Sequence, residues 1–199
     1  MADYWKKKKQ HINQYNLIAR FYNARYGIEQ YKKYDDVLSI LKLVNKNIIL
    51  DVGCGTGLFI NKIAPNGHFV IGIDISKRML QKAKTNCNNM PNVFLICSDA
   101  DYLPLKENLS CFVFVFTLLQ NMPDPERTII EIMRIAHDKA VIVLTAHKKA
   151  FTKKAFIQLL EKVGLNVSKF FTTEDLKDYI AICINHNKHN ITMEKTFIP

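Results

Sequence analysis

Several features are scarce in this sequence, and each scarcity removes a class of protein. The longest apolar runs, at residues 111–119 and 140–146, are far shorter than the roughly 18 to 20 residues that a membrane span requires. The basic residues from Lys6 to Lys9 precede no apolar stretch of the kind found in a secretory signal. We therefore expect a cytoplasmic protein with no membrane partner.

Cysteine occurs five times, an odd number, and never in a C-x-x-C pair. Cys97 and Cys111 lie in apolar, strand-like runs, where a thiol behaves as a small hydrophobic group. This usage indicates a reducing compartment. The group of residues most similar to a metal site, Cys183, His186 and His189, lacks a fourth protein ligand, so we expect no metal.

Glycine is also scarce, with seven residues in 199, and the sequence has no Ser/Gly-rich linker and no internal repeat. A chain of this length is typical of a single domain. Apolar residues make up 48% of it, which is enough for a full hydrophobic core. We expect one structural domain.

Short apolar runs alternate with amphipathic segments along the chain. The runs predict strands at 47–51, 68–74, 93–97, 111–117, 140–145, 167–171 and 179–184, and the segments predict helices at 12–26, 30–44, 58–63, 77–87, 125–136 and 153–163. Ser76 and Asp124 are expected to cap two of these helices, and Gly164 to end another. Strands that are apolar at nearly every position, separated by helices, indicate an α/β fold whose mostly parallel sheet is covered on both faces.

The most informative segment follows the first predicted strand and has the pattern D-x-G-x-G-x-G, from Asp51 to Gly57. Glycines at this place let the chain turn tightly and let a ligand approach backbone N–H groups. A dinucleotide fingerprint would need glycine or alanine where Leu58 stands. The acid at Asp51 would repel a pyrophosphate but suits an ammonium group, so an amino-acid-like ligand is favoured over a nicotinamide dinucleotide.

Two more acids stand at the ends of the next two predicted strands. Asp74 is in the position that accepts hydrogen bonds from ribose hydroxyls, with Ile75 beside it to contact an adenine face. Asp99 is placed to accept a hydrogen bond from the adenine amine, while the nearby Asp101 is equally well explained as a loop residue. Together with Asp51, these acids describe one ligand with an amine, a ribose and an adenine.

On these motifs the sequence resembles the class I S-adenosylmethionine-dependent methyltransferases, in particular the group that shares a domain with the ubiquinone and menaquinone biosynthesis methyltransferases. The resemblance runs from about Tyr15 to the last predicted strand. It implies S-adenosylmethionine as cofactor and a Rossmann-like, doubly wound sheet of seven strands in the order 3-2-1-4-5-7-6, with strand 7 antiparallel. It also implies that helices within residues 1–46 cover the cofactor mouth and that residues 47–199 form the methyltransferase domain.

The resemblance also assigns cofactor-binding residues. The segment from Tyr15 to Asn23 is similar to the family's entrance helix, in which Tyr15 and Tyr22 would close over the methionine end of the cofactor; the alternative is that both tyrosines simply form one apolar helix face. The cofactor-binding residues that it implies are Tyr15, Tyr22, Asp51, Gly53, Cys54, Gly55, Thr56, Gly57, Asp74, Ile75, Asp99, Ala100 and Phe116. For Gly57, a role in helix packing alone is the alternative. The family's Lys-Pro-Gly-Gly turn before the fifth strand is replaced here by residues 136–139, so the shape of that turn differs.

The expected reaction is an in-line displacement at an activated methyl group, which needs an oriented nucleophile more than a catalytic base. The loop at 116–123, after the fourth strand, faces the methyl group in the resembled fold. It lacks both the Asn/Asp-Pro-Pro-Tyr/Phe tetrad of amine methyltransferases and a Pro-Cys nucleophile. Gln120 and Asn121 are candidates for orienting the acceptor, and His147 is a candidate for taking a proton.

Charge leaves the acceptor open between a small molecule and RNA. Residues 1–46 carry 10 basic against 4 acidic groups, and residues 139–169 carry 7 against 1, which would steer an anion to the cofactor mouth. The bias has a second explanation, because 23 of the 28 basic residues are Lys beside 23 Ile and 17 Asn, as an AT-rich coding sequence produces. A non-catalytic subunit, or one that needs a small activating protein partner, is the alternative to an independent enzyme.

Overall fold

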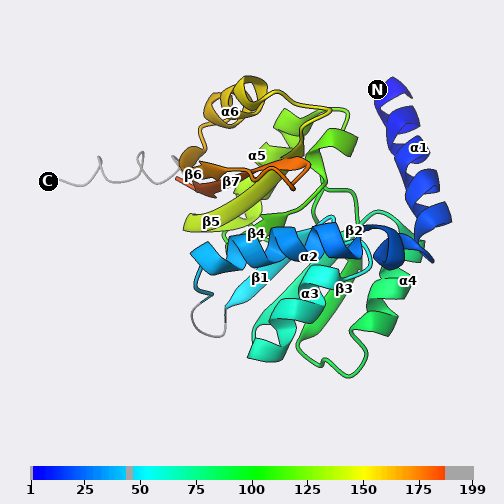
Figure 1. Ribbon diagram of the computed structural model, residues 1–199. Helices are drawn as coiled ribbons and strands as arrows, with labels where there is room; N and C mark the ends of the chain where they lie inside the picture. Colours follow the sequence, from blue (N-terminus) through cyan, green and yellow to red (C-terminus); the bar gives the residue numbers. More distant parts are fainter. Residues whose placement is uncertain (1, 44–46, 187–199) are drawn as a thin grey trace, which may run out of the picture.

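The computed structural model describes residues 2–43 and 47–186 and is built around one seven-stranded sheet (Figure 1). The strand order is β3-β2-β1-β4-β5-β7-β6, and β7 runs antiparallel to both of its neighbours, which confirms the expected fold class and topology. The strands are β1 (Ile48–Val52), β2 (Phe69–Asp74), β3 (Val93–Cys97), β4 (Ser110–Val115), β5 (Ala136–His147), β6 (Asn166–Phe171) and β7 (Asp178–Ile184).

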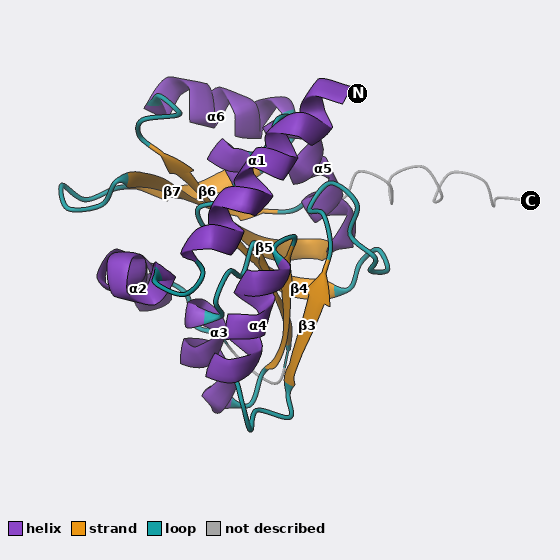
Figure 2. Ribbon diagram, turned by 90° about the vertical axis from the view of Figure 1, so that its right-hand side faces the viewer, coloured by secondary structure: helices purple, strands orange, loops and turns teal. Residues whose placement is uncertain are grey.

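Helices cover both faces of this sheet. They are α1 (Ala2–Ile18), α2 (Tyr22–Ile40), α3 (Leu58–Ile63), α4 (Lys77–Asn86), α5 (Pro125–Ile135) and α6 (Lys153–Lys162), with short 3-10 turns at Ala64–Asn66 and Leu119–Asn121. Side chains of α5 and α6 pack on one face, and those of α2, α3 and α4 pack on the other. Figure 2 shows α1 outside these layers, above α4, with which it is in contact.

The two hydrophobic cores follow from the alternation of side chains along the central strands. On β1, Ile49 faces the α2 and α3 side while Leu50 and Val52 face the α5 and α6 side, and all three are fully buried. Successive side chains of a strand point to opposite faces, so a strand with helices on both sides must be apolar throughout. This packing holds the carboxyl ends of β1, β2, β3 and β4 in line along one edge of the sheet.

The predicted bounds of the two N-terminal helices are wrong. The sequence placed the break between the helices near Gly27, whereas Gly27 lies inside α2 and the break falls at residues 19–21. A single helical glycine costs only about 1 kcal/mol relative to alanine, so it does not by itself end a helix. Tyr15 and Tyr22 therefore belong to two different helices, and the prediction that they share one entrance helix is also wrong.

The turn expected at residues 136–139 is instead the irregular first part of β5. Ala136 pairs with Ser110 of β4, and regular pairing resumes only at Val141. The side-chain amide of Asn185 donates to the carbonyl oxygens of Ala136 and His137 at 3.1 Å and thereby satisfies this irregular backbone. The amide replaces the hydrogen bonds that a regular ladder would supply.

The predicted helix ends at Ser76, Asp124 and Gly164 are confirmed, whereas the predicted end of the fourth strand is wrong. The side chains of Ser76 and Asp124 accept the expected capping hydrogen bonds, and Gly164 has the left-handed φ of 82° that ends a helix. The fourth strand ends at Val115, not at residue 117, because Thr117 adopts a φ of 56° that no strand accommodates.

The described part of the chain has neither a membrane-spanning helix nor a cluster of metal ligands. Within residues 2–43 and 47–186, no helix is both long and apolar enough to cross a membrane. All five cysteines are unpaired. No group of three potential metal ligands gathers in the part of the chain that the structure describes; of the residues considered from sequence, Cys183 lies in β7, His186 follows it, and His189 is outside the described residues.

Candidate active site

The glycine loop lies between β1 and α3 and is tied to the neighbouring strand. The N–H groups of Gly53 and Cys54 both donate to the carbonyl oxygen of Ile73, at 2.7 and 3.0 Å. Gly53, Gly55 and Gly57 all have positive φ, between 54° and 82°, which favours glycine over any L side chain. A Cβ atom on Gly57 would lie 3.2 Å from both the Cβ of Ala83 and the Sγ of Cys87 in and after α4. The third glycine therefore also lets α3 and α4 pack closely.

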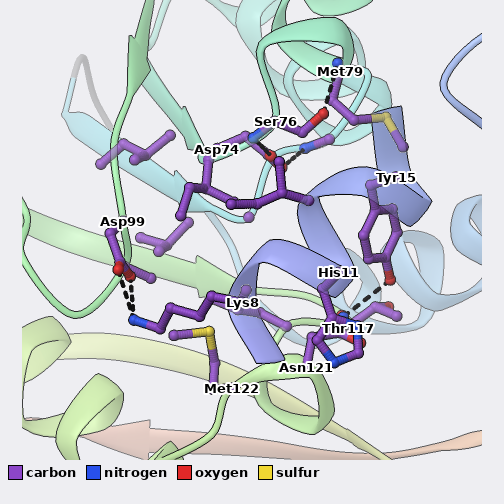
Figure 3. Close-up of a pocket in the computed structure, with 18 of the residues that line it drawn as sticks. Lys8, His11, Tyr15, Asp74, Ser76, Met79, Asp99, Thr117, Asn121 and Met122 are labelled. Atoms are coloured by element: carbon purple, nitrogen blue, oxygen red, sulfur yellow. Dashed lines mark hydrogen bonds and ion pairs between the residues drawn. The ribbon is translucent and has the colours of Figure 1, made fainter. Parts of the chain in front are cut away.

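Asp74, the last residue of β2, joins this loop to the turn before α4. Its Oδ2 accepts a hydrogen bond from the N–H of Gly55 at 2.9 Å, and its Oδ1 accepts one from the N–H of Ser76 at 2.8 Å (Figure 3). Burial raises the pKa of Asp74, and these two donors partly oppose the rise. Each carboxylate oxygen keeps one further lone pair, so the group can still accept from a pair of ligand hydroxyls.

Asp51 lies beneath the loop and is 2% exposed. Its Oδ2 has no hydrogen-bond partner among the described residues, and burial raises the pKa of its carboxyl to about 8, with the charge on Asp74 adding to the rise. A buried carboxyl in this condition gains from a cation placed beside it. The acids at Asp51 and Asp74 thus fit the ammonium and the ribose hydroxyls of S-adenosylmethionine.

The third acid has a protein partner that the sequence did not reveal. The Nζ of Lys8, on α1, donates to both oxygens of Asp99 at 2.7 and 2.6 Å (Figure 3). It also forms an ion pair with Asp101. The Lys8 side chain is 8% exposed, although its neighbours Lys7 and Lys9 are exposed. This cluster fastens α1 across the end of β3, and Asp101 is part of it.

A signal for Lys8 was present in the sequence. Lys8, His11, Ile12 and Tyr15 all line the same cavity, and they follow the i, i+3, i+4, i+7 spacing of one helix face. Lys8 lies seven residues before Tyr15, which the resemblance had assigned to the cofactor site. The prediction that the first helix begins near residue 12 hid this spacing.

The chain has two Tyr-Asn pairs, Tyr15-Asn16 and Tyr22-Asn23. The tyrosines line the cavity, and the asparagines bind the loops around it. Tyr15 and Tyr22 line the cavity with their ring centroids 6.3 Å apart. Asn16 accepts a hydrogen bond from the hydroxyl of Ser76 at 2.7 Å, and Asn23 accepts one from the hydroxyl of Thr56 at 2.5 Å. Burial raises the pKa of both tyrosines, so neither phenol is a base near neutral pH. The asparagines thus hold α1 and α2 onto the cofactor loops.

The far end of the cavity is formed by the loop after β4. Phe116, Thr117 and Asn121 line it, and the Nδ2 of Asn121 donates to the hydroxyl of Tyr15 at 3.0 Å. Gln120 points elsewhere and donates to the carbonyl oxygen of Thr117 at 3.0 Å. The Nδ1 of His147 accepts from the N–H of Lys149 at 3.0 Å, and His147 does not line the cavity. Of the three acceptor-side candidates, only Asn121 reaches the cavity.

The structure brings most of the predicted cofactor residues into this single cavity. Those lining it are Tyr15, Tyr22, Gly53, Gly55, Asp74, Ile75, Asp99, Ala100 and Phe116, and those just outside it are Asp51, Cys54, Thr56 and Gly57. The lining residues that the sequence did not single out include Lys8, His11, Met79, Thr117, Leu118 and Met122.

A fully buried ion pair lies behind this far end. The Nζ of Lys33, on α2, is paired with Asp178 at the start of β7, and the side chains are 0% and 1% exposed. The same Nζ donates to the hydroxyl of Thr117 at 2.9 Å. Neither charged residue lines the cavity. The pair adds a charged hydrogen-bond donor to the wall of the site without exposing it.

A seven-stranded sheet of this order, with a glycine loop after β1 and an acid at the end of β2, defines a class I S-adenosylmethionine-dependent methyltransferase fold. The comparison with protein families agrees, because residues 50–144 match the family model described as a methyltransferase domain. Residues 50–144 are therefore similar to the methyltransferase domain found in the menaquinone and ubiquinone biosynthesis enzymes, and the cofactor of this class of fold is S-adenosylmethionine.

Individual relatives fit this assignment. The chain is 31% identical, over 72% of its length, to demethylmenaquinone methyltransferase of Staphylococcus saprophyticus, and it covers 64% of that relative. It is similar in fold to magnesium protoporphyrin IX methyltransferase of Synechocystis, which was solved with bound S-adenosylmethionine. The TM-score is 0.66 at 21% identity, and the match covers 79% of this chain and 80% of that one. It is also similar in fold to a Haloferax volcanii methyltransferase solved in complex with the Trm112 activator, with a TM-score of 0.71, 16% identity, and coverage of 87% and 98%.

Proposed function

We propose that the protein transfers the methyl group of S-adenosylmethionine to a small-molecule acceptor in the cytoplasm. The observation that carries this proposal is the position of α1, whose Tyr15 receives a hydrogen bond from Asn121 of the loop after β4. The helix thereby covers the end of the cavity where the acceptor would enter. A small molecule fits beneath such a cover more easily than a folded polymer.

The roles of the site residues are part of the same proposal. Asp51 would face the cofactor's ammonium, Asp74 its ribose, and Asp99 its adenine amine, while residues 1–46 act as a cover. When bound, the cofactor supplies an activated methyl group. The protein's part is then to hold the acceptor in line with that group and to exclude water, for which Tyr15, Tyr22 and Phe116 provide apolar walls. Among the sequence candidates, Asn121 is best placed to orient the acceptor, and Gln120 and His147 remain predictions.

The distribution of charge supports a small acceptor over RNA. Lys8, Lys32, Lys33 and Lys177, which contribute to the basic blocks or flank them, are each paired with a carboxylate. Part of the positive charge counted from the sequence is therefore locally balanced, which weakens its pull on a distant anion. The name of the Staphylococcus relative points to a quinone-type acceptor.

RNA remains the second candidate because of the outer surface of α1. Trp5 is 47% exposed, the Nζ of Lys9 lies 5.8 Å from the centre of its ring, and Lys6 and Lys7 are exposed beside it. Aromatic and basic side chains together are the elements of single-strand binding. A partner-activated subunit is the third arrangement, as in the Haloferax volcanii complex.

The test measures transfer of a radiolabelled methyl group from S-adenosylmethionine to two pools, a chemically reduced small-molecule extract and total RNA. The proposal expects label in the small-molecule pool only. Label in RNA alone would overturn it. Calorimetric titration with S-adenosylhomocysteine runs beside this assay, and binding without transfer to either pool would favour a partner-activated subunit over an independent enzyme.

A further inference from the structure

Thr117, at the acceptor end of the cavity, has a backbone conformation that is costly for its residue type. Its φ is 56°, and β-branched residues rarely adopt positive φ. Three hydrogen bonds hold this backbone: its N–H donates to the hydroxyl of Thr145 at 2.8 Å, and its carbonyl oxygen accepts from Gln120 and Asn121 at 3.0 and 3.1 Å. Strained conformations fixed in this way occur preferentially at functional sites.

The side-chain hydroxyl of Thr117 accepts two hydrogen bonds from α2. The Nζ of Lys33 donates to its Oγ1 at 2.9 Å, and the Nε2 of Gln30 donates to it at 3.3 Å. A hydroxyl oxygen has two lone pairs and one proton, so both of its acceptor positions are used. The hydroxyl can then act only as a donor, and no group among residues 2–43 and 47–186 accepts its proton. Thr117 lines the cavity (Figure 3) whereas Gln30 and Lys33 do not, so the proton is the part of this hydroxyl that a ligand can use.

The Lys33 and Asp178 pair strengthens this donor. Burial of two charges is expensive, and replacing such a pair by apolar residues is often neutral or stabilising, so stability alone does not account for its presence. A hydrogen bond from an ammonium group draws electron density from the threonine oxygen and makes its own O–H a better donor. The result is a polarised hydroxyl on a residue that lines the cavity, hydrogen-bonded to the ammonium group of the buried Lys33 and Asp178 pair.

We infer that Thr117 is a positioning residue that donates its hydrogen bond to a negatively charged oxygen of the methyl acceptor, such as a phenolate. This inference rests on the proposed function, since it names the chemistry of the acceptor in the same cavity. The charged relay behind Thr117 favours the ionised form of a phenol over the neutral form. An acceptor so bound arrives with its proton already removed, which agrees with a cavity in which neither tyrosine is a base.

The test uses 4-nitrophenol as a probe, because its phenol and phenolate forms absorb at different wavelengths. The full-length protein is saturated with S-adenosylhomocysteine and titrated with the probe across a range of pH. The wild type is expected to bind the phenolate form preferentially and to lower the apparent pKa of the bound probe. Thr117→Val, which keeps the β-branched shape and removes the hydroxyl, is expected to lose about tenfold in affinity for the phenolate and to abolish that pKa shift.

Two further variants separate this role from a purely structural one. Thr117→Ser retains the hydroxyl and should restore both the affinity and the pKa shift of the probe. Thr85→Val removes an exposed hydroxyl of α4 that donates to the carbonyl oxygen of Gln81, outside the cavity, and should bind the probe as the wild type does. Equal affinity of Thr117→Val and wild type for the phenolate would overturn the inference.

The inference stays testable if Thr117→Val does not fold. Wild-type protein must then bind the 4-nitrophenolate anion more tightly than 4-nitrotoluene, which has a similar shape and no charged oxygen. Equal affinities would overturn the inference, while binding of S-adenosylhomocysteine would leave the proposed function standing. Failure to bind S-adenosylhomocysteine would overturn both.

Discussion

The two ends of the cavity are built in different ways. At the cofactor end, the lining groups are the glycine loop after β1 and the acids Asp74 and Asp99 at the ends of β2 and β3, with Asp51 of β1 buried behind them. At the acceptor end, the groups come from α1, α2 and the loop after β4, and Thr117 is held by Lys33, 84 positions away in the chain. The first end depends on local motifs and the second on long-range packing, so the two should respond differently to mutation.

The largest effect is expected at the cofactor end, from Asp74→Ala. This change removes the acceptor for the ribose and leaves the N–H groups of Gly55 and Ser76 without a partner. Affinity for S-adenosylhomocysteine, measured by calorimetric titration, should fall more than about a hundredfold, since hydrogen bonds to a charged group contribute about 1.5–3 kcal/mol each. The circular dichroism spectrum should be unchanged. Asp175→Ala, which removes an exposed carboxylate, is the control, and unchanged affinity in Asp74→Ala would contradict the ribose assignment.

Next in size is the effect of adding a methyl group to the glycine loop. Gly57→Ala combines positive φ with contacts at 3.2 Å to Ala83 and Cys87, whereas Gly67→Ala has similar φ and no atom within 4 Å. The positive φ costs about 1–2 kcal/mol in both variants, and overpacking adds about 1–3 kcal/mol in the first. Urea unfolding should therefore show a clearly lower midpoint for Gly57→Ala. Equal midpoints would mean that α3 can move away from α4 at little cost.

A smaller effect is expected from the ion pairs of Lys8, which hold α1 across the end of β3. Lys8→Ala leaves Asp99 and Asp101 without their cation and should loosen α1. Trypsin cleavage near the break between α1 and α2 should accelerate by about tenfold, which corresponds to about 1.4 kcal/mol, a part of the cost when a partly buried pair loses one member. Lys7→Ala, which removes an exposed neighbour, should leave the cleavage rate close to that of the wild type. Equal rates for the two variants would show that α1 is held by other contacts.

The smallest expected effect is the release of a proton from Asp51 when a ligand binds. Its pKa of about 8 in the folded protein lies above the unfolded value near 4, so between these values the unfolded chain binds fewer protons and the free energy of unfolding falls as pH rises. A bound ammonium favours the ionised carboxyl, so S-adenosylhomocysteine should release up to one proton at pH 7.

Calorimetry in buffers of different ionisation enthalpy measures this release. Asp51→Asn should eliminate it and should also flatten the decrease in stability between pH 5 and about pH 8 seen by thermal unfolding. Proton release that persists in Asp51→Asn would assign the titration to another group.

The difference between the two ends also explains what the sequence could and could not predict. The acids at Asp51, Asp74 and Asp99 were found because each ends a strand that is apolar enough to recognise, and parallel strands bring their carboxyl ends to one edge. Lys8 was missed because the first helix was predicted to begin near residue 12, which hid its spacing from Tyr15. Its partner is also 91 positions away, and the lysines beside it are exposed. Gln120 and Asn121 are adjacent in sequence, and only the turn at Thr117 decides which of them faces the cavity.

The N-terminal helices show the same limit in the backbone. The helices predicted at 12–26 and 30–44 put the break at 27–29, but the break falls where Asn16 and Asn23 must reach two different loops. Intrinsic preference is a weak guide when tertiary contacts of this kind compete with it. The sheet order followed from the resemblance and not from the strand pattern, which is compatible with several orders.

The position of α1 has a consequence for rates. Because α1 supplies one wall of the cavity and its Lys8 is bonded to the acid expected to meet the adenine, movement of that wall would control the cofactor's entry and exit. The apparent affinity of a ligand scales with the fraction of molecules in the open, binding-competent state. Cofactor exchange, and with it the number of turnovers per second, would then be governed by the movement of a helix and not by the transfer of the methyl group.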